Sequence, residues 1–286
     1  MLVALVFTGC KVKDEKKENK DEVKQEQDGI VYSNLVDEKT QNEVAGYLKE
    51  AGVSDDRVSL FLDWVKEMNG NIKTASAFHD GFTSAGSNQV NYDDVTLVNY
   101  EGPDGNVITD MNCRLTAYLL YGQFMNATEL KEDYDPFLMF DVEAIDQEER
   151  FASFRDNKNK FITIFDPVKV KEGSTLEEHM EAIQKAWKER GITMEDNGNI
   201  SLVTLYLHDT LDNLRFIGYT GVLLKQEDGL MFVEKYGWNM PFQCTKFDNE
   251  EELVKYVLDR NDLYGDGSEE PVIVMKNDKV ISGEVK

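Results

Sequence analysis

Several residue types are scarce in this chain of 286 residues, and each scarcity excludes a class of protein. Three cysteines are too few for a disulfide-stapled scaffold, and five prolines exclude a proline-rich stalk. No segment approaches the roughly 20 consecutive apolar residues that a membrane-spanning helix needs. Basic residues number only 31 against 55 acidic ones, and the net charge of −24 argues against a nucleic-acid partner.

Apolar residues, by contrast, are abundant enough for a large hydrophobic core. They make up 41% of the chain and aromatic residues make up 10%, which excludes a chain that is disordered throughout. The length is that of one large domain or two ordinary ones, and it suffices for folding without disulfides. No internal repeat and no clear linker interrupts residues 30–286, so we expect a single domain there.

The first ten residues have the pattern of a bacterial lipoprotein signal. Residues 1–9 are apolar or small, with the sequence MLVALVFTG, and Cys10 follows them directly. Such signals are cleaved beside a small residue, and lipid joins the sulfur of the cysteine. The pattern therefore predicts a signal peptide over residues 1–9 and a lipid anchor with palmitate-type chains on Cys10. The alternative is a buried N-terminal strand that contains an ordinary cysteine.

A highly charged tract, KVKDEKKENKDEVKQEQDG, follows over residues 11–29. It contains almost no apolar residue, so it cannot bury enough surface to offset the entropy lost on ordering. We expect residues 10–29 to form a lipidated, flexible tether that holds the domain at the outer face of the bacterial cell membrane. The membrane is then a partner through the two-chain anchor alone, because an acidic domain is repelled by anionic lipid.

The hydrophobic pattern predicts mainly helices in the first half of the domain. Capping boxes at Thr40 with Glu43 and at Ser174 with Glu177 predict two helix starts. Apolar residues at helical spacing predict further helices, including one that begins near residue 112.

Strands are predicted from about residue 200 onward. Runs of β-forming residues cover residues 202–207, 215–224 and 230–236, and Asp228 with Gly229 predicts a hairpin turn. We therefore expect an α+β fold in which a helical N-terminal half precedes an antiparallel β-sheet meander.

The strongest candidate for chemistry is Cys113. Asp110 or Asn112 can cap a helix that starts here, which places Cys113 in its first turn. There the helix dipole and the free backbone N–H groups favour a thiolate, and Arg114 adds a positive charge. This arrangement is typical of an activated cysteine nucleophile. The alternative is a small buried cysteine at a helix start.

Three histidines could serve as the base for such a nucleophile. His208 ends a predicted strand, precedes Asp209 and lies downstream of Cys113, which is the chain order of papain-like folds. We expect His208 to be the base if Cys113 is catalytic, and otherwise to be hydrogen-bonded at a sheet edge. His179 lies in a charged run and is expected to be solvated, and His79 is expected in a loop.

The motifs predict no metal, nucleotide or other cofactor. The chain has no Cys-x-x-Cys or His-x-x-x-His spacing and no glycine-rich phosphate loop after a strand. Four acidic residues could hold calcium, although a solvated acidic loop fits their spacing better: Asp262, Asp266, Glu269 and Glu270. The sequence leaves open a disulfide between Cys113 and Cys244.

Seven short segments together carry a family resemblance. They are YSNLVD at 32–37, NCR at 112–114, LHD at 207–209, FIGYTGVL at 216–223, FVEK at 232–235, PFQ at 241–243 and KF at 246–247. These segments resemble the domain of unknown function 4300 family, a family of uncharacterised lipoproteins of Gram-positive bacteria. The resemblance covers nearly everything after residue 29 and implies no activity. The candidate binding residues are Asn112, Arg114, Tyr219, Glu234, Lys235 and Gln243.

A weaker likeness is to the papain-like amidases of bacterial cell walls. These place a cysteine at a helix start and a histidine at the head of a strand of the form His-x-Gly-Val. The corresponding segment here is YTGV at residues 219–222, so Tyr219 stands where the histidine is expected. A tyrosine, with an unperturbed pKa of about 10, is a poor base near neutral pH. If the fold is papain-like, either His208 substitutes for that histidine or the site is inactive.

Two functions therefore remain open on the sequence alone. The first is a binding or accessory lipoprotein that holds a cell-wall peptide, a sugar or a membrane-protein partner in a groove near Cys113. Aromatic residues of the β half could line such a groove, although most are expected in the core. The second is a cysteine amidase or peptidase for wall peptides, with Cys113 as nucleophile and His208 as base. The incomplete catalytic set favours the first.

Overall fold

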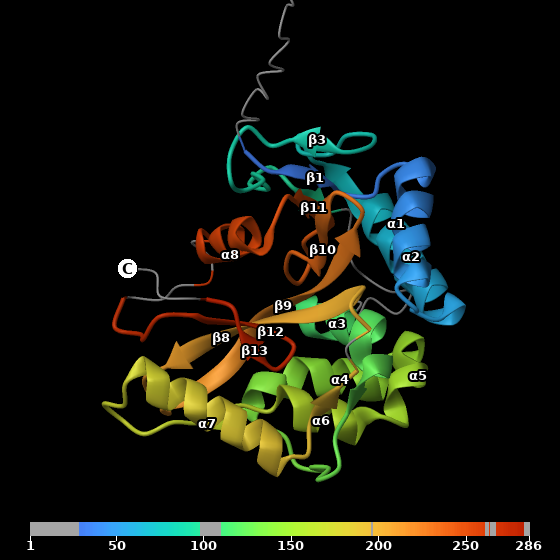
Figure 1. Ribbon diagram of the computed structural model, residues 1–286. Coiled ribbons are helices and arrows are strands. Elements are labelled where there is room, and N and C mark those ends of the chain that lie inside the picture. The colour runs from blue at the N-terminus through green and yellow to red at the C-terminus, as the bar shows by residue number, and fades with distance from the viewer. Residues whose placement is uncertain (1–28, 98–109, 196, 261–262, 264–266, 283–286) are drawn as a thin grey trace, which may run out of the picture.

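The computed structural model describes residues 29–97, 110–195, 197–260, 263 and 267–282. The predicted signal peptide, Cys10 and nearly all of the tether lie outside the described residues. The described part is an α+β protein whose helices dominate the first half and whose antiparallel sheet dominates the second, which confirms the predicted fold class (Figure 1). No described helix is both long enough and apolar enough to cross a membrane.

One large antiparallel sheet runs through the molecule. Its strands are β1 (Val31–Ser33), β3 (Thr83–Ser84), β6 (Val168–Lys169), β8 (Ile200–Asp209), β9 (Leu214–Gln226), β10 (Gly229–Lys235), β11 (Phe242–Phe247), β12 (Ile273–Lys276) and β13 (Lys279–Val280). Their order is β13-β12-β8-β9-β10-β11-β1-β3, and β6 pairs with the start of β9. The consecutive strands β8 to β10 are the predicted meander, and β11 extends it.

Segments from both ends of the described chain complete this sheet. Strand β1 pairs with β11, where Tyr32 lies opposite Thr245, and β12 pairs with β8, where Val274 lies opposite Leu205. Four shorter strands form two separate pairs: β2 (Ile72–Thr74) with β4 (Thr96–Leu97), and β5 (Met125–Asn126) with β7 (Thr193–Met194).

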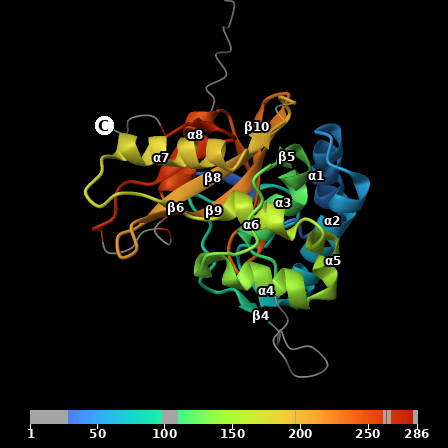
Figure 2. The ribbon, with the colours of Figure 1, turned by 90° about the horizontal axis from the view of Figure 1, so that it is seen from below.

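The helices lie on both sides of the meander. They are α1 (Glu38–Glu50), α2 (Asp55–Asn71), α3 (Cys113–Tyr121), α4 (Met139–Gln147), α5 (Ala152–Arg155), α6 (Lys158–Phe165), α7 (Leu176–Glu189) and α8 (Glu250–Leu258). In Figure 1, α3 to α7 lie below β8 and β9, and α8 lies above them. Helix α3 packs against β9 and is flanked by α2 and α6 (Figure 2). Its position makes it the central helix of the fold.

Two helix starts differ slightly from the predicted ones. Helix α1 begins after Asp37, whose carboxylate accepts the N–H of Thr40 at 2.9 Å, so Thr40 is capped and is not itself the cap. Helix α7 begins with a capping box of Thr175 and Glu178, one residue later than the box predicted at Ser174. In both cases a second good capping residue lies close to the predicted one.

The sheet separates two hydrophobic cores because neighbouring residues of a strand point to opposite faces. Val222 and Val233 belong to the larger core, beneath the helices of the first half, whereas Leu223 and Phe232 belong to the smaller one. The smaller core also contains Cys113 and buried residues of α8. The candidate site therefore lies where the start of α3 meets the smaller core.

Candidate functional site

Cys113 occupies the first position of α3, as the sequence predicts. The Asn112 side chain caps this helix by accepting the N–H of Leu115 at 2.9 Å. The cysteine is nevertheless buried, with 8% of its surface exposed. Its sulfur accepts the backbone N–H of Thr220 on β9, while burial raises the pKa of the thiol and the charge of Arg114 opposes this only in part. The environment therefore favours a neutral thiol over a thiolate.

Arg114 is committed to a buried carboxylate. Its guanidinium donates to both oxygens of Asp141, with Nη2 at 2.5 Å and Nε at 3.1 Å from Oδ2. Asn112 donates to the same carboxylate at 2.7 Å. Asp141 is fully buried, and the remaining Arg114 donors contact the carbonyls of Phe137 and Ile217. The predicted binding residues Asn112 and Arg114 thus join α3 to α4.

His208 lies apart from Cys113. In the register of β8 and β9 it faces Arg215, whereas Tyr219 faces Leu205. His208 thus lies three residues along β8 from the position that faces Tyr219, which corresponds to about 10 Å. The Nδ1 atom of His208 accepts the backbone N–H of Glu270 at 3.1 Å. The structure therefore does not bring the predicted nucleophile and base together, because the strand that carries the histidine continues past the start of α3.

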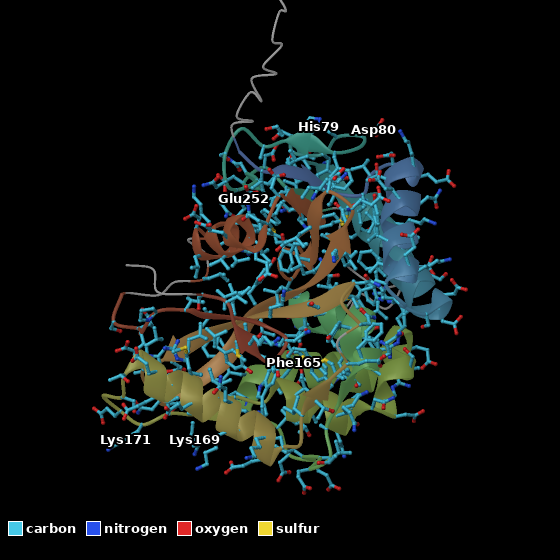
Figure 3. All side chains as sticks on the ribbon, viewed as in Figure 1. His79, Asp80, Phe165, Lys169, Lys171 and Glu252 are labelled. Carbon is cyan, nitrogen blue, oxygen red and sulfur yellow. The ribbon has the colours of Figure 1, made fainter. Side chains whose placement is uncertain are left out.

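The expectation that His179 is solvated is wrong. It is 1% exposed, its ring lies 4.8 Å from that of His208, and its Nδ1 accepts Nε of Arg215 at 2.9 Å. The signal that could have identified this burial is its spacing of four residues from the core residue Ile183. His79 is exposed and lies near β3, at the edge of the molecule, where Figure 3 labels it.

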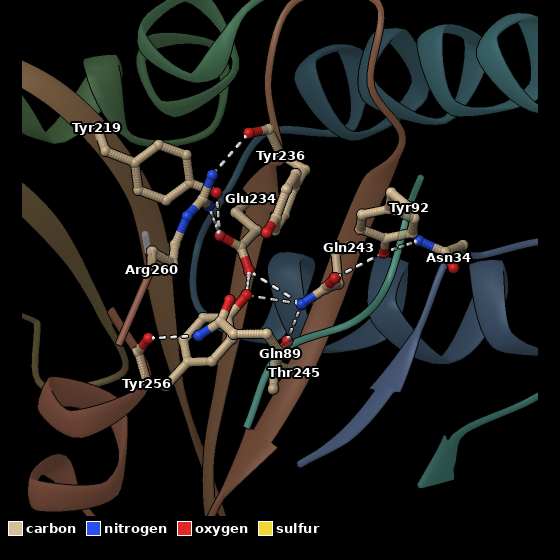
Figure 4. Close-up of polar contacts among 10 residues, drawn as sticks. All are labelled: Asn34, Gln89, Tyr92, Tyr219, Glu234, Tyr236, Gln243, Thr245, Tyr256 and Arg260. Carbon is tan, nitrogen blue, oxygen red and sulfur yellow. Dashed lines mark hydrogen bonds and ion pairs between the residues drawn. The ribbon is translucent and has the colours of Figure 1, made fainter. Parts of the chain in front are cut away.

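A buried hydrogen-bond network includes Tyr219, which belongs to the same hydrophobic core as Cys113 (Figure 4). Its centre is Glu234 on β10, which is fully buried. Tyr219 donates a hydrogen bond to Oε2 of Glu234, and Tyr256 donates to Oε1 at 2.6 Å. Arg260 lies 3.5 Å from Oε2, and Gln243 donates to Oε1 at 3.2 Å. Tyr219 is thus a donor to a carboxylate and is not poised as a base.

Arg260 fills the space between two aromatic rings. Its guanidinium carbon lies 3.9 Å from the ring centroid of Tyr219 and 3.9 Å from that of Tyr236. Its Nη2 donates to the backbone carbonyl of Tyr236 at 3.1 Å, and the residue is 1% exposed. Cation–π contacts on both faces and a carboxylate at the edge together compensate this buried charge.

The network continues from Glu234 to the first strand. Tyr92 donates to Oε1 of Gln243 at 2.6 Å, and Asn34 donates to the Tyr92 hydroxyl at 2.7 Å (Figure 4). Burial raises the pKa of Tyr92 well above its ordinary value, so the phenol stays protonated. Gln243 also donates to Tyr256 at 2.8 Å. These bonds fix the segment after β1 to the centre of the sheet.

Lys235 forms a second buried ion pair beside Cys113. Its ammonium lies 2.7 Å from Oδ2 of Asp110, and both side chains are fully buried. Lys235 also donates to the carbonyl of Met240, and Asp110 accepts the N–H of Asn239 at 2.9 Å. The pair therefore holds the loop between β10 and β11 against the start of α3. Together with Glu234 and Gln243, Lys235 is engaged inside the protein.

The described residues offer no obvious metal site, since no group of three or more His, Cys, Asp or Glu side chains could hold an ion there. Asp262 and Asp266 of the acidic loop lie outside that part of the chain. Cys113 and Cys244 are both free, which answers the question of a disulfide.

Sequence reasoning missed Arg260, Tyr256, Tyr92 and Asn34 as members of the network. Asn34 lies in the family segment at residues 32–37, but that segment implies no role for it, and the other three residues lie in no recognisable motif. Their only signal is the concentration of tyrosines near Glu234 in space, which depends on how α8 and the first strand dock.

A family model matches residues 31–281 of the chain, and its description is "Domain of unknown function (DUF4300)". No curated protein and no solved structure matched the chain. The match covers most of the chain and confirms the resemblance seen in the sequence. The chain therefore belongs to the DUF4300 family.

Proposed function

We propose that this protein is a surface lipoprotein whose folded domain binds a ligand or partner and has no cysteine-dependent activity. The proposal places the domain at the outer face of the membrane, anchored by lipid on Cys10. Candidate partners are a cell-wall peptide, a sugar or a membrane protein. The N-terminal sequence pattern supports the anchor, and the closed surroundings of Cys113 support the absence of catalysis.

The observation that carries the non-catalytic assignment is the hydrogen bond from Tyr219 to Glu234. A general base must offer a lone pair to the nucleophile's proton. Burial raises the pKa of Tyr219 well above its ordinary value, and its proton is directed at the carboxylate. His208, the other candidate, is engaged with Glu270 further along the sheet. Neither group is placed to activate Cys113.

A papain-like cysteine hydrolase is the alternative, and the order of three residues supports it. Cys113 starts a helix, Tyr219 lies on β9, and Glu234 lies on the adjacent strand β10. Nucleophile, base and orienting residue follow in this order in papain-like proteases. Under this alternative Cys113 would act on cell-wall peptides with His208 as base, or the site would be inactive because Tyr219 stands in place of the catalytic histidine.

Alkylation of Cys113 as a function of pH separates the two functions. The full chain would carry Cys10→Ser, so that Cys113 and Cys244 are its remaining thiols. A second variant that also carries Cys113→Ala would show which part of the alkylation signal comes from Cys113. We expect slow alkylation that accelerates only above the unperturbed thiol pKa of about 8.5. Cys244 is fully buried and serves as the matched unreactive cysteine. A Cys113 reaction that titrates well below that value would support the hydrolase instead.

Cell fractionation tests the location independently. In a Gram-positive host, the full chain should partition with the membrane, whereas Cys10→Ala should not be retained there. If the variant stays with the membrane as firmly as the original chain, the lipid anchor on Cys10 is refuted.

A further inference from the structure

A pocket of about 250 Å³ lies beside the C-terminal end of α3, at the other end of this helix from Cys113. It is formed by α2, α3 and α5, which lie together in both ribbon views (Figures 1 and 2). Its lining residues are Ser54, Asp56, Arg57, Leu60, Tyr118, Leu119, Ser153, Phe154 and Asn157. The volume suits a small molecule or the end group of a larger one.

Arg57 supplies a positive charge to this pocket, and hydrogen bonds to α3 hold its side chain in place. Its Nη1 atom donates to the carbonyls of Tyr118 at 3.1 Å and Leu119 at 2.6 Å. These two bonds orient the guanidinium plane and use one of its three nitrogen atoms. The Nε and Nη2 atoms have no hydrogen-bond partner among the described residues, so two donors of a planar fork remain available.

Arg57 also lacks a carboxylate partner, although the protein is strongly acidic. No described Asp or Glu lies within ion-pair distance of it, whereas Arg190, which lines a second pocket, lies 3.1 Å from Asp166. A second cation, Lys160, lies close enough that the charge of Arg57, after burial, lowers its pKa. The local field at this pocket is therefore positive, on a molecule with a net charge of −24.

Three residues with neutral hydrogen-bonding side chains line the same pocket as Arg57: Ser54, Ser153 and Asn157. Ser54 caps α2 without a side-chain hydrogen bond, and no bond within the described residues engages the side chains of Ser153 and Asn157. Two hydroxyls and an amide beside a guanidinium fork are the groups that bind planar or tetrahedral oxyanions. Asp56 is the one carboxylate in the lining, and it is exposed to solvent, as are Ser54, Ser153 and Asn157.

We propose that this pocket binds the oxyanion group, a carboxylate or a phosphate, of a small ligand or of the end of a larger one. Arg57 supplies the charge and the bidentate donors, and Ser54, Ser153 and Asn157 supply the remaining hydrogen bonds. The lining of this pocket includes neither Cys113 nor Cys10. The proposal can therefore be tested independently of the function proposed above.

Titration of the full chain with acetate and with inorganic phosphate at constant ionic strength tests this site. Backbone amide chemical shifts of Ser54, Ser153 and Asn157 would report binding. We expect saturable shifts confined to the pocket, with the dissociation constant raised about tenfold or more by Arg57→Gln, which removes a charge-assisted pair of bonds. A response to acetate alone identifies a carboxylate ligand, and a response to phosphate alone identifies a phosphoryl group.

Two further variants separate binding from folding. Ser153→Ala with Asn157→Ala leaves the Arg57 contacts to α3 intact and should still weaken binding severalfold. Arg155→Gln is the matched control, because Arg155 also donates to two backbone carbonyls, at 3.0 and 2.9 Å, but does not line the pocket. Absence of saturable shifts in the original chain, or equal affinity in Arg57→Gln, would overturn the proposal.

Discussion

Two arginines of this protein are equally buried and differ in how their charge is compensated. Arg215 is fully buried and Arg260 is 1% exposed. Arg260 lies between two tyrosine rings and beside the Glu234 carboxylate. Arg215 has no carboxylate within ion-pair distance among the described residues, and it donates to the neutral ring of His179 and to the carbonyls of Tyr206 and Pro271.

The difference shows that the protein accommodates the two buried guanidinium charges in different ways. Around Arg260, the carboxyl group of Glu234 and two tyrosine rings contact the guanidinium directly. Around Arg215, by contrast, the nearby histidines His179 and His208 avoid repulsion with the guanidinium only while their rings are neutral. Burial lowers the pKa of Arg215 to about 10, with the charge of Glu270 opposing it. The Arg215 cluster therefore contains two histidine rings that can be protonated, which makes it sensitive to acid.

The largest effect is expected from Glu234→Gln, which removes a carboxylate charge that lies 3.5 Å from the buried guanidinium of Arg260. Because both side chains are fully buried, the substitution should lower the free energy of unfolding by about 3–5 kcal/mol. Urea unfolding of the variant measures it. Glu43→Gln is the control, since the Glu43–Lys246 pair is one-third exposed and should lose no more than about 1 kcal/mol. Equal losses in the two variants would refute the central role of Glu234.

Acid should destabilise the protein through the cluster of Arg215, His179 and His208. Burial, followed by the charge of Arg215, lowers the pKa of both His179 and His208 from the ordinary 6.5. Four acids oppose this shift: Glu178, Asp209, Glu269 and Glu270. Because the unfolded chain binds these protons first, stability is full above about pH 6.5. It falls below that pH, by as much as about 1.4 kcal/mol per pH unit for each histidine.

The matched variant for this acid effect is His179→Gln with His208→Gln. Neither glutamine titrates, so the slope of stability against pH below 6.5 should flatten relative to the original chain. An unchanged slope would assign the acid sensitivity to other groups and would remove the distinction between the two arginine clusters.

Tyr219→Phe is expected to have a smaller effect than either change above. It keeps a ring beneath the Arg260 guanidinium and removes only the hydroxyl bond to Glu234, which corresponds to about 1.5–3 kcal/mol for a bond to a charged group. Thermal or urea unfolding gives the value. A loss much below 1 kcal/mol would mean that Tyr256 and Gln243 satisfy the carboxylate without Tyr219.

The sequence predicts the meander and the helix start at Cys113 because both depend on local signals. Long β-forming runs define β8 to β10, and Asn112 is a strong cap. The three-residue strand β1 has no measurable period, so its place beside β11 could not be predicted. Likewise, the partners of Glu234 come from β9, β11 and the end of α8, and only the docking of these elements brings them together.

The smallest expected effect comes from Glu270→Gln, which is the counterpart of Glu234→Gln at the other arginine. Glu270 influences Arg215 through space, without an ion-pair contact, and its backbone N–H to His208 is kept in the variant. The free energy of unfolding at neutral pH should therefore fall by less than about 1 kcal/mol. Urea unfolding, run beside Glu234→Gln, provides the comparison. A loss as large as that of Glu234→Gln would mean that Glu270 is the true counter-ion of Arg215, and that the two buried arginines are compensated in the same way.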